Sequence, residues 1–161
     1  MNDKKLLSML EKDPFADSAK LASKLGCEAC EVEAEIKRLE DAKVIVGYNT
    51  MVDWHKMGSE RIVAYIELKI SPTNGEGFDK VAKRIAKYPQ VKSVSLMSGA
   101  YDLLLTVEGK GLAEVAMFVS QKLAPMAGVL STATHFMLKK YKENGIDYDV
   151  PDQDDRGLFN L

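Results

Sequence analysis

A short turn between two apolar stretches carries the groups that a zwitterionic small molecule requires. Gly99 has no side chain, so neighbouring backbone N–H groups can approach a carboxylate. Asp102 supplies an anion for an ammonium group. We therefore treat Ser98, Gly99, Ala100, Tyr101 and Asp102 as a candidate effector-binding loop for an amino acid. The alternative is a plain hairpin turn, in which Gly99 reverses the chain, Tyr101 packs and Asp102 satisfies the backbone.

Other chemistry-bearing side chains do not form a catalytic or metal-binding set. Cys27 and Cys30 are the only cysteines, half of what a four-cysteine zinc site needs, and His55 and His135 are distant in sequence. The C-x-x-C spacing at a helix start favours a thiolate, so a redox switch is one interpretation and inert thiols are the other. No Ser/His/Asp set or phosphate-binding loop is found. The sequence predicts no catalytic residue, no metal and no cofactor.

The first part of the chain predicts three short helices. Apolar spacing gives one from Asp3 to Glu11, and Asp13-Pro14 ends it. A second helix fits Ser18 to Leu25, with Gly26 supplying the left-handed residue that stops it. A third helix runs from about Glu28 to Ala42. Its buried stripe consists of Val32, Ile36 and Leu39, at i, i+4 and i+7.

Two short strands are expected after the third helix. Val44–Val46 and Tyr48–Val52 flank Gly47 and read as a β-wing. Three helices and a wing are typical of a winged helix-turn-helix, whose third helix enters the major groove of DNA. The predicted groove-facing residues are Ala29, Cys30, Glu33, Ala34 and Lys37, and Lys20 and Lys24 are predicted to meet phosphates.

The third helix carries more acid than base, which opposes DNA binding. Its glutamates are Glu28, Glu31, Glu33 and Glu35. Phosphate neutralisation supplies much of the affinity for DNA, so this excess is a physical objection. The helix dipole favours acid in the first turn and explains Glu28 and Glu31 only. We therefore expect one module to bind weakly and useful affinity to come from several modules on one oligomer.

The second part of the chain changes period. Apolar residues occupy every second position from Ile62 to Ile70, which predicts a strand with one buried face. They are Ile62, Ala64, Ile66, Leu68 and Ile70. Further elements are expected at Gly77–Lys87 (helix), Val91–Met97 and Tyr101–Val107 (strands), 112–123 (helix) and Gly128–Tyr141 (strand). The order βαββαβ predicts a ferredoxin-like unit, a four-stranded antiparallel sheet with both helices on one face. The fold class is therefore α+β.

Composition and charge support two small domains within 161 residues. Residues 1–54, the helix-turn-helix, carry a net charge of −3, and residues 55–142 carry +6. We expect a hinge at 55–60, an effector-binding and oligomerisation domain at 61–142, and a solvated tail at 143–161 with net charge −5. No apolar run reaches the roughly 18–20 residues of a membrane span, and no signal-peptide core is seen, so a cytoplasmic location without membrane contact is expected.

Four motifs in order resemble the Lrp/AsnC family of regulators. They are the Leu25-Gly26 turn with the following helix Val32-x-x-x-Ile36-Lys37-Arg38-Leu39-Glu40, the segment Val44-Ile45-Val46-Gly47-Tyr48, the loop Gly99-x-Tyr101-Asp102, and the strand Ser131-Thr132-x-Thr134. The resemblance covers about residues 3 to 142. It implies a transcription regulator with an ACT-like (RAM) sensing domain.

The resemblance also implies partners and further site residues. Lys37 and Arg38 lie in the family's basic stretch, which adds Arg38 to the predicted DNA contacts. Amino acids are the usual effectors, held between neighbouring dimers against Ser98–Asp102 and the hydroxyls of Thr132 and Thr134. The expected partners are double-stranded DNA, a small-molecule effector and further copies of the chain, as a dimer, tetramer or octamer built through the sensing domains.

Two other functions share this architecture. The sirohaem decarboxylases of a haem pathway have the same two domains, but they need basic and histidine side chains to hold a tetrapyrrole's carboxylates. A metabolite-binding oligomer whose acidic third helix docks another protein is the second alternative.

Overall fold

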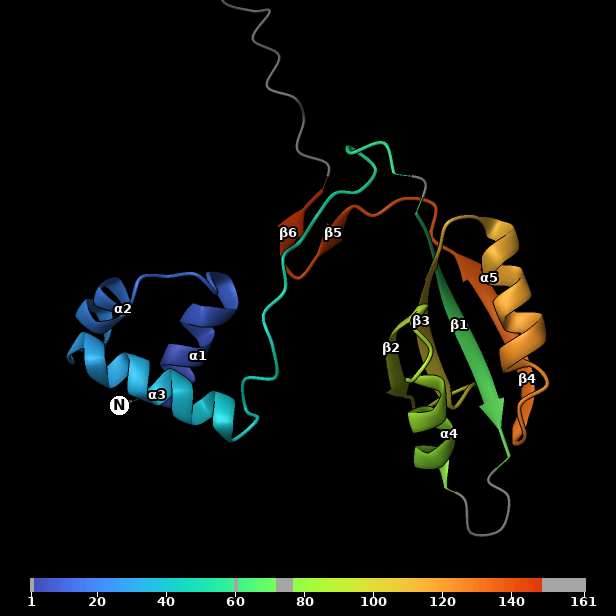
Figure 1. Cartoon of the computed structure of the whole chain (residues 1–161), viewed down its shortest axis with the longest axis horizontal. Helices are drawn as coiled ribbons and strands as arrows, with labels where there is room; N and C mark the ends of the chain where they lie inside the picture. The colour runs from blue at the N-terminus through green and yellow to red at the C-terminus, as the bar shows by residue number, and fades with distance from the viewer. Residues whose placement is uncertain (1, 60, 72–76, 149–161) are drawn as a thin grey trace, which may run out of the picture. The chain divides into compact units, whose positions relative to one another are not determined.

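A computed structural model describes residues 2–59, 61–71 and 77–148 (Figure 1). Contacts divide the chain into two compact units, Met1–Val52 and Asp53–Leu161, so the division falls two residues before the expected boundary at residue 54. Each unit has its own apolar core. Within the described ranges, no helix has the length and apolar character that crossing a bilayer requires.

The first unit contains the three expected helices, α1 (Asp3–Lys12), α2 (Ser18–Leu25) and α3 (Ala29–Asp41). The Asp17 side chain accepts a hydrogen bond from the Ala19 N–H at 3.3 Å and so begins α2. The buried side chains that join the helices are Leu6, Leu10, Leu21, Ala22, Val32 and Leu39. The apolar stripe of α3 is thus the surface on which α1 and α2 pack.

The two strands of the predicted wing are not formed. Residues 43–59, all of them described, contain no strand. The N–H groups of Val44 and Ile45 instead bond back to the Leu39 carbonyl, at 2.9 and 3.1 Å, and Val46 is 88% exposed. An isolated two-stranded ribbon is marginal in water, and this unit offers no third strand to support one. The first unit is therefore a helix-turn-helix with an irregular extension.

The second unit is a four-stranded antiparallel sheet in the order β2-β3-β1-β4. The strands are β1 (Ile62–Ile70), β2 (Val91–Leu96), β3 (Leu103–Gly109) and β4 (Val129–Phe136). Helices α4 (Phe78–Ile85) and α5 (Leu112–Phe118) lie on one face (Figure 1), and α5 continues as the π-helical turn η1 (Val119–Leu123). The predicted βαββαβ order and ferredoxin-like sheet are confirmed.

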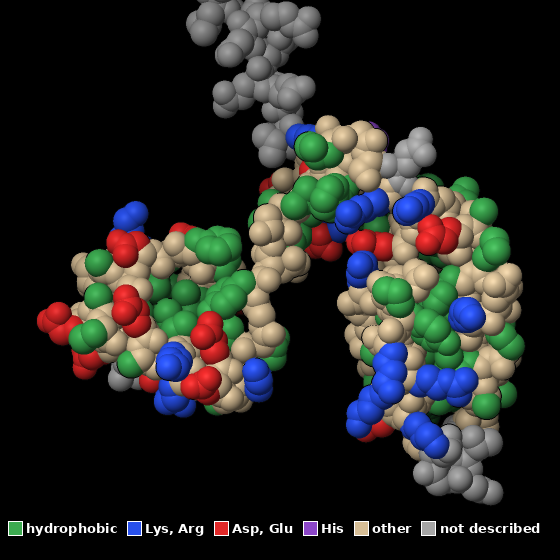
Figure 2. Space-filling model, viewed as in Figure 1, with side chains coloured by type: hydrophobic (Ala, Val, Ile, Leu, Met, Phe, Trp, Pro, Cys, Tyr) green, Lys and Arg blue, Asp and Glu red, His purple; other side chains and the backbone are tan. Residues whose placement is uncertain are grey.

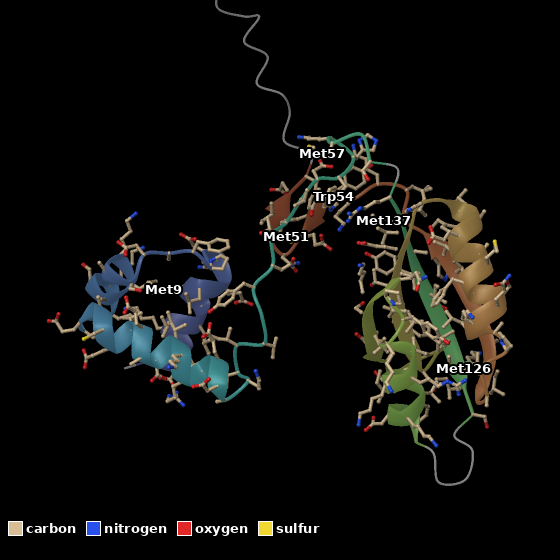
Figure 3. The ribbon with its side chains drawn as sticks, viewed as in Figure 1. Met9, Met51, Trp54, Met57, Met126 and Met137 are labelled. Atoms are coloured by element: carbon tan, nitrogen blue, oxygen red, sulfur yellow. The ribbon has the colours of Figure 1, made fainter. Side chains whose placement is uncertain are left out.

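Alternation along β1 builds the core of this unit. Its residues Ala64, Ile66, Leu68 and Ile70 point to the helices and are at most 5% exposed. Met126, labelled in Figure 3, joins the same core at 4% exposure. The residues between them face the other side of the sheet, where the described part of the second unit has no helix.

The chain after β4 departs from the expected long strand. β4 ends at Phe136, and a hairpin follows, formed by β5 (Lys142–Glu143) and β6 (Ile146–Asp147). Its turn has positive φ at both Asn144 (48°) and Gly145 (81°), as a tight type I′ hairpin requires. The first residues of the expected solvated tail are therefore folded, and residues 149–161 lie outside the described ranges.

Candidate functional site

The turn between α2 and α3 is fixed by backbone and side-chain hydrogen bonds. Gly26 ends α2 with φ of 72°, and its N–H donates to the Ala22 carbonyl at 2.8 Å. Cys27 is half-buried and packs against the helical core. Glu28 and Glu31 then form a capping box, in which the Glu28 N–H donates to the Glu31 carboxylate at 2.9 Å. The start of α3 is thus held rigidly relative to α2.

The exposed face of α3 contains four of the five residues expected to read bases. Cys30, Glu33, Ala34 and Lys37 are all exposed, and their i, i+3, i+4, i+7 spacing places them on one side of the helix. Ala29, the fifth, is half-buried against the core. On α2, the side chains of Lys20 and Lys24 are exposed.

Arg38 is held within the helical unit. Its guanidinium donates to Asp3 of α1 at 2.8 Å and to Glu35, one turn back on α3, at 2.9 and 3.0 Å. The hydrogen bond from Arg38 is the main reason that the pKa of Glu35 lies below its usual value. An Arg38 that contacts a phosphate, as the sequence suggests, has to share its guanidinium with these two carboxylates or release them.

The structure reduces the electrostatic objection to DNA binding. Glu28 and Glu31 are used by the capping box, and Glu35 is neutralised by Arg38. Of these four glutamates, Glu33 alone has no hydrogen-bond or ion-pair partner among residues 2–59, 61–71 and 77–148. On the face that would meet DNA, the exposed carboxylates beside Lys37 are therefore Glu33 and, one turn further on, Asp41.

The candidate effector loop lies at one end of the sheet. Gly99 has a φ of 143°, which favours glycine, and Ser98, Gly99 and Ala100 are exposed. Asp102 is half-buried: its N–H donates to the Leu68 carbonyl at 2.9 Å, and its carboxylate accepts from the Ile70 N–H at 2.7 Å. One carboxylate oxygen thus satisfies the end of β1, and this geometry matches the plain hairpin-turn interpretation of Asp102.

The strand register places Thr132 and Thr134 apart from this loop within one chain. They pair with Leu68 and Ile66, so they lie on the helix side of the sheet and are half-buried. β1 lies between β4 and β3, so these two strands are about 10 Å apart. The loop and the two threonine hydroxyls therefore form two separate patches on the surface of a single subunit.

The single tryptophan of the chain, Trp54, has a cationic partner. The Trp54 ring, labelled in Figure 3, stacks on the Arg61 guanidinium, which lies 3.8 Å from the ring centroid. Among the residues that the structure describes, no group of three or more His, Cys, Asp or Glu side chains is arranged to hold a metal ion.

Sequence comparisons connect the chain to regulators of transcription. The family model described as the Lrp/AsnC ligand binding domain matches residues 63–146. The chain is 43% identical over 152 residues to YugG, an uncharacterised HTH-type transcriptional regulator of Bacillus subtilis, covering 94% of this chain and 92% of that protein. It is 26% identical over 144 residues to the proline dehydrogenase transcriptional activator of Rhizobium radiobacter, covering 89% and 92%.

Solved structures share the fold at lower identity. The transcriptional regulator NMB0573 of Neisseria meningitidis, in complex with L-Met, aligns with a TM-score of 0.70 and 22% identity over 91% of this chain and 92% of that one. AsnC of E. coli aligns with a TM-score of 0.67 and 16% identity over 88% and 93%. Both alignments cover the helix-turn-helix region as well as the α/β domain.

Proposed function

The chain belongs to the Lrp/AsnC family of HTH transcriptional regulators, and on that premise we propose that it binds specific double-stranded DNA through α3 and adjusts this binding to an amino acid. The observation that carries the proposal is the exposed face of α3, where Cys30, Glu33, Ala34 and Lys37 stand together on a rigidly capped helix. The relatives are transcriptional regulators and not enzymes, so the sirohaem decarboxylase interpretation is dropped.

The effector is proposed to be an amino acid bound at Ser98–Asp102. The L-Met complex of the Neisseria meningitidis regulator supports this class of ligand. Exposed backbone at Ser98 to Ala100 suits a carboxylate, and the second oxygen of Asp102 suits an ammonium group. Since Thr132 and Thr134 form a separate patch in one chain, we place a ligand that touches both groups where two subunits meet.

Oligomerisation then links the effector to DNA. A homo-oligomer, whether a dimer, a tetramer or an octamer, would hold several α3 helices at fixed spacing. An effector bound between subunits favours one assembly, and DNA favours the assembly whose helices match its grooves. Because one module offers little positive charge, several modules on one oligomer supply the affinity. The protein would act in the cytoplasm, where the DNA is.

Selection of bound genomic fragments tests the proposal. The full-length protein is mixed with fragmented genomic DNA at a low and at a physiological salt concentration, with and without each amino acid, and bound fragments are sequenced. We expect an enriched sequence with two-fold symmetry, and a change in its recovery with at least one amino acid. No enrichment at either salt concentration would contradict DNA binding and favour the alternative in which α3 docks a protein.

A further inference from the structure

One face of α4 is strongly basic. Lys80, Lys83 and Arg84 of α4, and Lys87 in the turn that follows, are exposed at i, i+3, i+4 and i+7 spacing. The apolar residues of α4 lie on the opposite side, against the sheet; they are Phe78, Val81, Ala82 and Ile85. Figure 2 shows blue side chains gathered over α4. We call the side formed by Lys80, Lys83, Arg84 and Lys87 the basic face.

Helix stability explains only part of this arrangement. Lys83 and Arg84 lie in the last turn of α4, where positive charge complements the helix dipole. Lys80 lies in the first turn, where the dipole disfavours a cation. Like charges at i, i+4 spacing, such as Lys80 with Arg84 and Lys83 with Lys87, also oppose each other. The repulsion between Lys83 and Lys87 therefore costs stability in the free protein, and an external anion would relieve it.

Three of its four cations lack a carboxylate partner. Within the described ranges, Lys83, Arg84 and Lys87 have no ion-pair partner. By contrast, Lys92 on the adjacent strand β2 lies 3.7 Å from the Glu108 carboxylate. Lys83, Arg84 and Lys87 are thus uncompensated cations within a segment, residues 55–142, whose net charge is +6.

We propose that the basic face binds the phosphate backbone of double-stranded DNA. This sequence-independent contact is additional to the contact made by α3. The inference rests on the proposed function, and it answers the weak charge of the helix-turn-helix, whose residues 1–54 carry −3. From Lys80 to Lys87 the chain rises about 10 Å, which matches about three phosphates along one strand of a duplex. Charge complementarity and exposure suit a regular polyanion better than an apolar or mixed partner.

The test is the salt dependence of DNA binding by full-length variants. Lys83→Ala/Lys87→Ala removes two lysines from the basic face, and Lys110→Ala/Lys122→Ala removes two exposed lysines elsewhere in the same unit. Each lost phosphate contact lowers the slope of log affinity against log salt by about 0.9. For Lys83→Ala/Lys87→Ala we expect a slope about 1.8 shallower than that of the parent. Over a tenfold rise in salt concentration, the fold-loss of affinity should therefore be roughly 60 times smaller for this variant than for the parent.

Two duplexes separate this contact from base reading. Phosphate contacts weaken binding uniformly across sequences, so Lys83→Ala/Lys87→Ala should weaken a mixed-sequence duplex and the selected fragment equally. The control pair Lys110→Ala/Lys122→Ala should match the parent. Circular dichroism melting and light scattering establish that fold and assembly are retained.

Each outcome decides the proposal. If the parent binds the selected fragment and Lys83→Ala/Lys87→Ala has the parent's slope, the basic face does not touch DNA, and an acidic protein becomes its partner instead. If both pairs of substitutions reduce the slope equally, the effect comes from the net charge of the protein, and the proposal that the basic face contacts DNA is wrong. If the parent binds no duplex, the proposed function fails and this inference fails with it.

Discussion

Replacing Asp102 separates its structural role from its proposed role in effector binding. In Asp102→Ala, the Ile70 N–H loses the carboxylate that accepts from it at 2.7 Å. In Asp102→Asn, the amide oxygen can still accept that hydrogen bond, but the negative charge is lost. The alanine variant therefore removes both roles, and the asparagine variant removes the charge alone.

The size of the effect follows from the geometry. A hydrogen bond to a charged group contributes about 1.5–3 kcal/mol, and leaving a half-buried N–H without a partner costs a similar amount. Asp102→Ala should therefore destabilise the α/β unit by about 1.5–3 kcal/mol. Each kcal/mol lowers the unfolding midpoint by roughly 4 °C or more in a unit of this size. Asp102→Asn should stay within about 1 kcal/mol of the parent.

Tryptophan fluorescence provides the assay. Trp54 is the single tryptophan, and it lies in the same compact unit as the loop, stacked on Arg61 at the start of β1. Thermal unfolding of the full chain, followed at Trp54, gives the stability of this unit, and titration with each amino acid gives the response. We expect Asp102→Asn to be stable yet unresponsive.

Two results would refute this reasoning. An Asp102→Ala variant with the parent's unfolding midpoint would show that the carboxylate does not support the end of β1. An Asp102→Asn variant that responds to the amino acid like the parent would show that the charge has no part in effector binding.

Three further predictions concern the helical unit, each followed by far-ultraviolet circular dichroism. Gly26→Ala should lower its stability by about 1–2 kcal/mol, because φ is 72° at that position; an unchanged midpoint would be inconsistent with the left-handed turn. Arg38→Ala should lower the midpoint and Lys37→Ala should not, since only Arg38 links α1 to α3 through Asp3; equal midpoints would argue against that link. The pKa of Glu35 is lower in the folded chain than the ordinary value of 4.5. The ionised Glu35 therefore stabilises the fold fully at a pH above 4.5, and this stabilisation is lost as the pH falls through the folded-state pKa. Glu35→Gln should therefore flatten the acid side of the stability curve, and a curve like the parent's would remove Glu35 from the account.

Local sequence patterns were sufficient for most of the secondary structure. The stripe Val32, Ile36 and Leu39 defined α3, Gly26 marked the end of α2, and strict alternation defined β1. These features depend on residues within one or two turns of each other. The hairpin turn at Asn144-Gly145 is a short-range signal of the same kind, although the acidic charge of residues 143–161 favours a solvated extension.

Features that depend on distant partners could not be predicted. Val44–Val46 has the composition of a strand, but no partner strand is available in its unit. The contact of Arg38 with Asp3 joins residues 35 positions apart, and that of Asp102 with Ile70 joins residues 32 apart. By contrast, the i, i+3 spacing of Glu35 and Arg38 is visible in the sequence. This spacing is sufficient to predict that Arg38 compensates part of the negative charge of the helix.

Lys37 offers the most direct measurement of whether α3 enters a DNA groove. The full-length Lys37→Ala variant is compared with the parent for affinity to the fragment selected by the parent, with Lys12→Ala as an exposed control from the same unit. We predict that Lys37→Ala loses about 1–3 kcal/mol of binding free energy, a factor of roughly five or more, and that Lys12→Ala loses none. Equal affinities of Lys37→Ala and the parent would contradict the placement of α3 on DNA.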